Sequence, residues 1–125
     1  MSNLSAPALL VGRILIAAIF LISGFGKLMD PAGTAGYMSS VGLPGILVWP
    51  TIVVELLGGI LIVVGYQTRI VALILAAFTL VAGLLFHLQP ADMGQMINFW
   101  KNIAIVGGFL FLFAGGPGPL SIDRR

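Results

Sequence analysis

Long apolar runs separated by short polar segments dominate the hydrophobic pattern of this chain. Each run can cross roughly 30 Å of hydrocarbon at about 1.5 Å per residue. Backbone groups in lipid must form their hydrogen bonds within the same segment, so the pattern predicts helices. The predicted spans are approximately residues 8–28, 46–66, 69–87 and 96–115.

Turn-forming residues separate the predicted spans. Gly65 and Thr68 predict a tight turn in which the glycine ends one helix and the threonine caps the next. Asp30 and the proline after it predict a cap and first turn, so a short interfacial helix is expected within residues 31–41. The connection of residues 89–95 contains a proline and is expected to be a plain loop.

The composition agrees with a membrane protein. Hydrophobic residues make up 59% of the chain and charged residues 8%, with a mean hydropathy of +1.14. A soluble domain carries about a quarter of its residues charged. The length of 125 residues leaves room for the spans and short loops only. We therefore predict one membrane domain over residues 1–125, an all-α polytopic protein folded as a four-helix antiparallel transmembrane bundle.

Several classes of chemistry are disfavoured. The chain contains no cysteine, which removes thiolate nucleophiles and thiolate metal ligands, and its single histidine makes a metal site improbable. Six Lys and Arg against four Asp and Glu are too few and too scattered for a nucleic-acid footprint. Nucleotide-loop, serine-hydrolase and zinc-protease motifs are missing, so any oxidoreductase role would depend on a bound cofactor or a partner.

The basic residues divide unequally between the two ends of the predicted bundle. Short loops rich in Lys and Arg stay on the cytoplasmic side of a membrane. The distribution therefore predicts that both termini are cytoplasmic. Arg13, Arg69, Arg124 and Arg125 lie at one end, and Lys27 and Lys101 at the other.

Glu55 is the strongest polar signal inside a predicted span. About nine residues separate it from the outer end of its helix, which places it roughly 14 Å deep. A charge there costs at least about 2.5 kcal/mol unless it faces a partner or a watery cavity. Lys101 in the fourth span is predicted as its partner, with an axial offset of about 6 Å. Two alternatives stay open: a Glu55 that only locks the bundle, and a Lys101 that extends to the headgroups.

Further polar side chains are expected near this pair. Asn98 and Asn102 share nearly one helical face with Lys101, while Lys27 and His87 end the first and third spans at the same level. We predict that they complete a ligand-binding cluster in the outer half of the bundle. For the asparagines the alternative is hydrogen bonding between helices, and for Lys27 and His87 it is a plain interfacial position.

Motifs along most of the chain resemble the DoxX family of small four-helix bacterial inner-membrane proteins. The resemblance implies the same fold and location. It also implies a link to quinol oxidation or to oxidative-stress complexes, since the namesake is similar to a small subunit of an archaeal respiratory system. The matching segments are residues 12–13, 23–27 (SGFGK), 30–37 (DPAGTAGY), 54–55, 65–69 (GYQTR), 98–102 (NFWKN), 116–118 and 120–125.

These observations favour a membrane redox accessory or quinone-binding subunit, whose polar cluster binds and protonates a lipophilic headgroup. The quinone would be its cofactor, and a membrane redox complex its partner beside the lipid bilayer. Two other classes stay open. One is a small transporter or channel for a proton or small solute, for which a pore would require an oligomer. The other is a membrane scaffold for a partner complex, in which the buried polar residues only specify the bundle.

Overall fold

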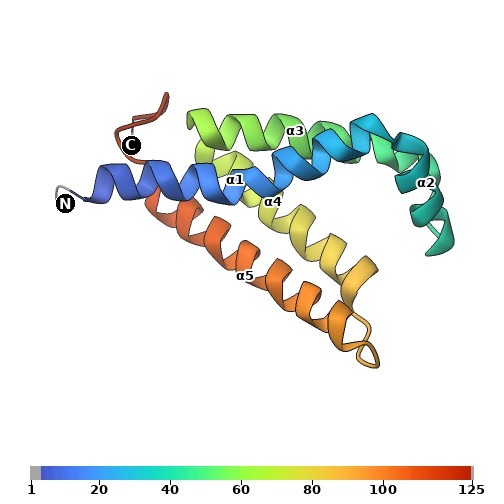
Figure 1. The fold of residues 1–125 in the computed structure, drawn as a ribbon. Coiled ribbons are helices and arrows are strands. Elements are labelled where there is room, and N and C mark those ends of the chain that lie inside the picture. The colour runs from blue at the N-terminus through green and yellow to red at the C-terminus, as the bar shows by residue number, and fades with distance from the viewer. Residues whose placement is uncertain (1–3, 125) are drawn as a thin grey trace.

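The computed structural model describes residues 4–124, which are mostly helical (Figure 1). Four helical segments are long and apolar enough to cross a membrane, and the described residues include no strand. The predicted all-α, four-helix membrane architecture is thereby confirmed. In chain order the elements are α1 (Ser5–Met29), α2 (Pro31–Ser40), the 3₁₀ turn η1 (Gly45–Leu47), α3 (Val48–Val64), α4 (Thr68–Ala82), the π-helical turn η2 (Gly83–His87) and α5 (Met93–Gly115).

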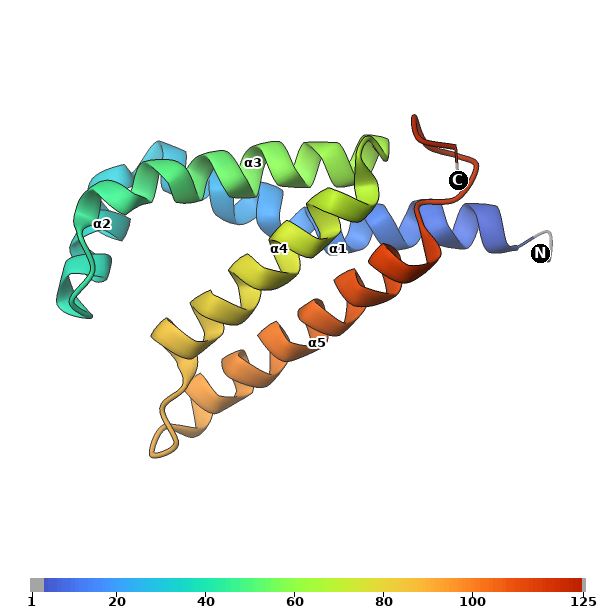
Figure 2. The same ribbon diagram turned by 180° about the vertical axis from the view of Figure 1, so that it is seen from behind.

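The membrane helices associate as two pairs. α1 packs along α3, and α4 packs along α5 (Figure 1). The pairs converge at the end that holds both termini and the turn of residues 65–67, which we call the closed end. They diverge toward α2 and the loop of residues 88–92, which we call the open end (Figure 2). The bundle is therefore wedge-shaped.

The main hydrophobic core fills the part of the wedge where the two pairs meet. Phe20 of α1 and Phe109 of α5 join the pairs there, with ring centroids 5.5 Å apart. Outward-facing apolar side chains such as Ile22 and Phe111 are exposed, as a lipid-facing surface requires. The buried core consists of Ala17, Phe20, Ile62, Val71, Ala72, Leu75, Ala76, Phe109 and Leu112.

α2 lies across the open end of the first pair. Its first turn is capped as the sequence predicts, because the Asp30 carboxylate accepts a hydrogen bond of 3.1 Å from the Gly33 amide. Met38 on its inner side packs against Val48 and Ile52 of α3. A second, smaller core therefore fixes α2 beside the entrance to the space between the pairs.

The start of α5 differs from the sequence prediction. The helix begins at Met93, inside the segment expected to be a loop. The reason is local: the Asp92 carboxylate accepts a hydrogen bond of 3.2 Å from the Gln95 amide and caps the first turn. The third span also departs from a uniform α-helix, because its last turn, Gly83–His87, is π-helical.

A buried arginine closes the other end. Arg13 is 1% exposed, and its Nη1 donates to the carbonyl oxygens of Ile62 at 3.1 Å and Val63 at 2.8 Å. Its Nη2 donates to the Leu120 carbonyl oxygen in the C-terminal tail. The last carbonyls of a helix have no partner within the helix. Arg13 therefore donates hydrogen bonds to carbonyl groups at the end of α3 and holds the C-terminal tail next to them.

The cap of α4 also comes from the tail, and the prediction that Thr68 provides it is wrong. The Asp123 carboxylate accepts hydrogen bonds from the amides of Gln67 at 2.9 Å and Thr68 at 2.8 Å. Its own amide donates to the Gly65 carbonyl oxygen at 2.8 Å. A carboxylate suits a helix N-terminus because the exposed amides and the helix dipole are positive there.

Replacing Arg13 tests the importance of this clamp. We expect Arg13→Gln to lower the free energy of unfolding by about 3 kcal/mol, because buried carbonyls lose charge-assisted donors. Denaturant titration of the purified protein in mild detergent measures the change. Arg124→Gln, which removes the same charge from an exposed position, is the control, and equal stability of the two variants would contradict the role assigned to Arg13.

Candidate functional site

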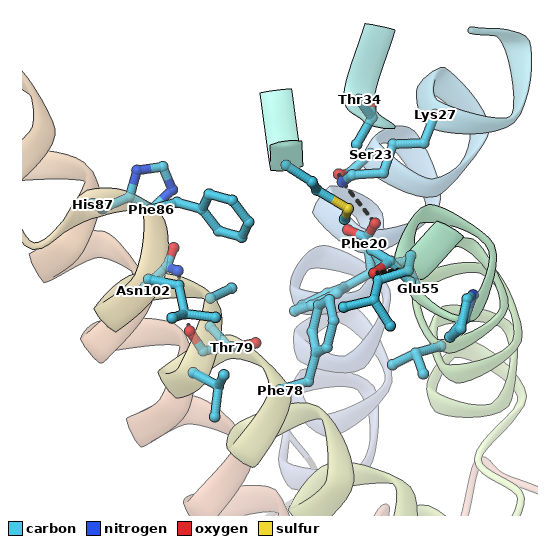
Figure 3. Close-up of a pocket in the computed structure, with 18 of the residues that line it drawn as sticks. Phe20, Ser23, Lys27, Thr34, Glu55, Phe78, Thr79, Phe86, His87 and Asn102 are labelled. Carbon is cyan, nitrogen blue, oxygen red and sulfur yellow. Dashed lines mark hydrogen bonds and ion pairs between the residues drawn. The ribbon is translucent and has the colours of Figure 1, made fainter. Parts of the chain in front are cut away.

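A cavity of about 610 Å³ lies between the two helix pairs in the open half of the wedge (Figure 3). Apolar side chains form most of its surface, including the rings of Phe20, Phe78 and Phe86. Polar groups are fewer: Thr34 and Tyr37 come from α2 and Thr51 from α3, and the others lie on opposite walls. The α1–α3 wall contributes Ser23, Lys27 and Glu55, and the α4–α5 wall contributes Thr79, His87 and Asn102.

Glu55 forms an ion pair with Lys27. The Lys27 Nζ lies 2.7 Å from the Glu55 Oε1 and donates a second hydrogen bond of 2.6 Å to the Ser23 hydroxyl. Glu55 is 4% exposed and lies ten positions into the 20-residue span Gly45–Val64. That position is about 15 Å along the helix, in the middle of the hydrocarbon. The ion pair offsets much of the cost of placing a carboxylate there.

The absence of a side chain at Gly24 brings the two charges together. A Cβ at this position would lie 2.8 Å from Leu56 Cγ and 3.1 Å from Glu55 Cβ, so no larger residue fits without a shift. α1 therefore approaches α3 closely, as small residues allow in membrane helices. Lys27 follows Gly24 by one turn on the same face, and its stem extends back toward Glu55 (Figure 3).

The ion pair has hydrogen-bonding capacity left on its cavity side. An ammonium group has three N–H donors, of which Glu55 and Ser23 take two. Among the described residues, Glu55 Oε2 accepts no hydrogen bond. One donor and one acceptor are thus available to a molecule in the cavity.

The predicted pairing of Glu55 with Lys101 is wrong. α5 packs on α4, and the cavity separates it from Glu55 on α3. Lys101 and Asn98 are exposed, do not line the cavity and form no hydrogen bond or ion pair within residues 4–124. Depth along the membrane normal was therefore a poor guide to the partner, because the packing of helices into pairs decides which residues at that depth meet.

The second wall contains the remaining predicted residues. The His87 Nδ1 lies 2.7 Å from the Gln95 Oε1, which orients the imidazole at the end of the π-helical turn. Asn102 Nδ2 donates a hydrogen bond of 3.2 Å to the Thr79 carbonyl oxygen. Asn102 therefore does connect helices, as the alternative interpretation expected. Of the six predicted residues, Lys27, Glu55, His87 and Asn102 share one cavity.

Sequence reasoning missed two residues, Thr79 of this wall and Gln95, the partner of His87. Gln95 was assigned to a loop, although Asp92 three positions earlier is a recognisable cap that would have extended the helix over it. Thr79 reads as a small packing residue on a helical stripe. It is 4% exposed and lines the cavity, yet its hydroxyl has no hydrogen-bond partner among the described residues.

The fold and site define an integral membrane protein with a mostly apolar cavity between two helix pairs, lined in part by a buried ion pair. The chain belongs to the DoxX family, whose pattern it matches over residues 8–88. No solved structure matches it.

Curated relatives agree with this assignment. The inner membrane protein YqjF of Escherichia coli (strain K12) is 43% identical over 99% of this chain and 95% of its own length. The inner membrane protein YphA of the same organism is 41% identical over 94% of this chain and 89% of its own length. The "Putative oxidoreductase CatD" of Bacillus subtilis (strain 168) is 34% identical, over 66% of this chain and 62% of its own length. The chain is thus an integral inner-membrane protein.

Removing the lysine tests the importance of the ion pair. We expect Lys27→Met to lower the free energy of unfolding by about 3 kcal/mol, because Glu55 loses its cation in a buried position. The double variant Lys27→Met, Glu55→Met should recover most of that loss, since no buried charge remains. Lys101→Met is the matched control at an exposed position. Denaturant titration in detergent compares the four proteins, and a Lys27→Met cost no larger than that of Lys101→Met would refute the assignment.

Proposed function

We propose that this DoxX-family protein is a redox-associated membrane subunit that binds a lipophilic quinone in the cavity between its helix pairs. The observation that carries the proposal is a mostly apolar cavity of about 610 Å³ with a buried ion pair on one wall. Ligand sites typically have volumes of roughly 300–1,000 Å³ and combine an apolar surface with a few polar groups that orient the ligand.

The residues present fit a quinone headgroup. The free Lys27 N–H can donate to a ring carbonyl oxygen, and the free Glu55 oxygen can accept from a ring hydroxyl. The neighbouring Phe20 and Phe78 rings offer flat apolar surfaces to the ring of the ligand. The pair can therefore hold either the oxidised or the reduced form.

The route of entry also supports a lipophilic ligand. Ile19 of α1 and Val81 of α4 line the cavity, and both are about half exposed, at 51% and 52%. Their exposure supports a lateral opening between the diverging pairs. In a membrane, that opening faces the hydrocarbon, where long-chain quinones reside.

Within this function, Glu55 exchanges one proton with a ring oxygen, and Lys27 stabilises the carboxylate when it is charged. A bound quinone supplies two-electron, two-proton redox chemistry, and the protein supplies binding, orientation and electrostatics. The two electrons and the second proton would be exchanged with a partner redox protein in the membrane. One relative, CatD, carries a provisional oxidoreductase name, which supports such an association.

Ligand titration tests the proposal. We expect 2-decyl-1,4-benzoquinone to bind the wild-type protein in detergent, measured by isothermal titration calorimetry. Glu55→Gln should weaken binding about tenfold, or about 1.4 kcal/mol, since the amide no longer matches the charge of Lys27. Lys101→Met should bind like the wild type, because Lys101 lies outside the cavity. No binding to the wild type, or equal binding to the wild type and Glu55→Gln, would overturn the proposal.

We further propose that both termini are cytoplasmic, which places the open end and its cavity in the outer half of the membrane. The arginines of the closed end support this orientation. Fusions at the C-terminus provide the test in bacteria: a fluorescent protein should be bright and an alkaline phosphatase inactive. An active phosphatase would reverse the orientation.

A further inference from the structure

The hydroxyl of Thr79 is a buried polar group without a partner. Threonine hydroxyls in helices usually donate to the carbonyl one turn earlier, but the Thr79 Oγ1 makes no hydrogen bond within the described residues. Leaving a buried hydroxyl unpaired costs about 1–3 kcal/mol. Because the side chain is 4% exposed and lines the cavity, a molecule in the cavity can satisfy it.

The backbone of Thr79 is held against α5. The Thr79 carbonyl oxygen accepts the hydrogen bond from Asn102, which ties α4 to α5 at this level. One turn later, Gly83 approaches Asn102 so closely that a Cβ would lie 3.3 Å from the Asn102 side chain. Thr79 thus belongs to a firmly packed wall.

The ion pair and the Thr79 hydroxyl therefore lie on opposite sides of the mostly apolar cavity. The Lys27 and Glu55 pair lies on the α1–α3 wall, and Thr79 lies on the α4 wall across from it (Figure 3). We propose that Thr79 is the second anchor of the ligand, which selects rings with oxygen substituents on two opposite edges, as in 1,4-quinones and their hydroquinones. This inference rests on the function proposed above and adds the substitution pattern that the site recognises.

The chemistry of a hydroxyl suits both redox forms. A threonine hydroxyl can donate to a ring carbonyl oxygen and can accept from a ring hydroxyl by rotating about one bond. The ion pair offers the same two options through separate atoms, Lys27 Nζ and Glu55 Oε2. Both edges of the ring can thus be held before and after reduction.

The test compares a ligand with two oxygens and a ligand with one. The probes are 2-decyl-1,4-benzoquinone and 3-decylphenol, titrated into full-length protein in detergent. We expect Thr79→Val, which keeps the shape but removes the hydroxyl, to weaken quinone binding about fivefold to tenfold, the effect of one hydrogen bond. Phenol binding should not change, because the ion pair holds its single oxygen. Thr79→Ser should restore quinone binding.

Thr51→Val is the matched control. Thr51 also lines the cavity, but its hydroxyl already donates to the Leu47 carbonyl oxygen at 2.9 Å. Its replacement should leave the affinities for both probes unchanged. A second readout covers folding: Thr79→Val should raise the midpoint of thermal unfolding without ligand, because it removes an unpaired buried hydroxyl.

The possible results separate this inference from the proposed function. If the wild type binds the quinone in a Glu55-dependent manner but Thr79→Val binds it equally well, the second anchor is wrong and the proposed function stands. An equal loss for both probes, or a lower unfolding midpoint for Thr79→Val, would show a structural role instead. If the wild type does not bind the quinone, both proposals fail.

Discussion

A carboxylate in the middle of a membrane helix is stabilised by a cation within reach, and this interaction shapes the first helix pair. Glu55 lies too deep for water to solvate it cheaply, so its charge depends on Lys27. The two groups meet because Gly24 lets α1 lie directly against α3. Packing and electrostatics are therefore coupled: the ion pair requires the close contact, and the contact places the ion pair at the edge of a cavity.

The wedge shape follows from where the chain forms its strongest connections. At the closed end, Arg13 of α1 donates to a carbonyl at the end of α3 and to the C-terminal tail. Asp123 of that tail caps the start of α4. Toward the open end the helix pairs diverge, and α2 packs mainly against α1 and α3 of the first pair. The Tyr37 ring of α2 stacks on Phe86 of the second pair, with centroids 5.4 Å apart, and so borders the entrance. The connected closed end and the divided open end support the lateral entry proposed for the ligand.

The two walls differ in chemistry. One holds a charge pair that can donate and accept, and the other holds neutral groups, with His87 oriented by Gln95 and Thr79 left unpaired. An enclosed charge beside an apolar surface is expensive to maintain, which supports the binding role proposed for this cavity. The family assignment establishes an inner-membrane protein. The chemistry proposed for it depends on these side chains rather than on the fold.

The sequence by itself determined the four membrane helices, the cap at Asp30 and the importance of Glu55, because hydropathy and local capping depend only on neighbouring residues. It also named Lys27, His87 and Asn102, which do line the cavity. Only the tertiary structure decided that Lys27, and not Lys101, pairs with Glu55, and that Asp123 caps α4. Partners distant in sequence depend on which helices pack together. Which helices pack together depends on close contacts of small residues, such as that of Gly24 with Glu55 and Leu56. A hydropathy pattern does not show these contacts.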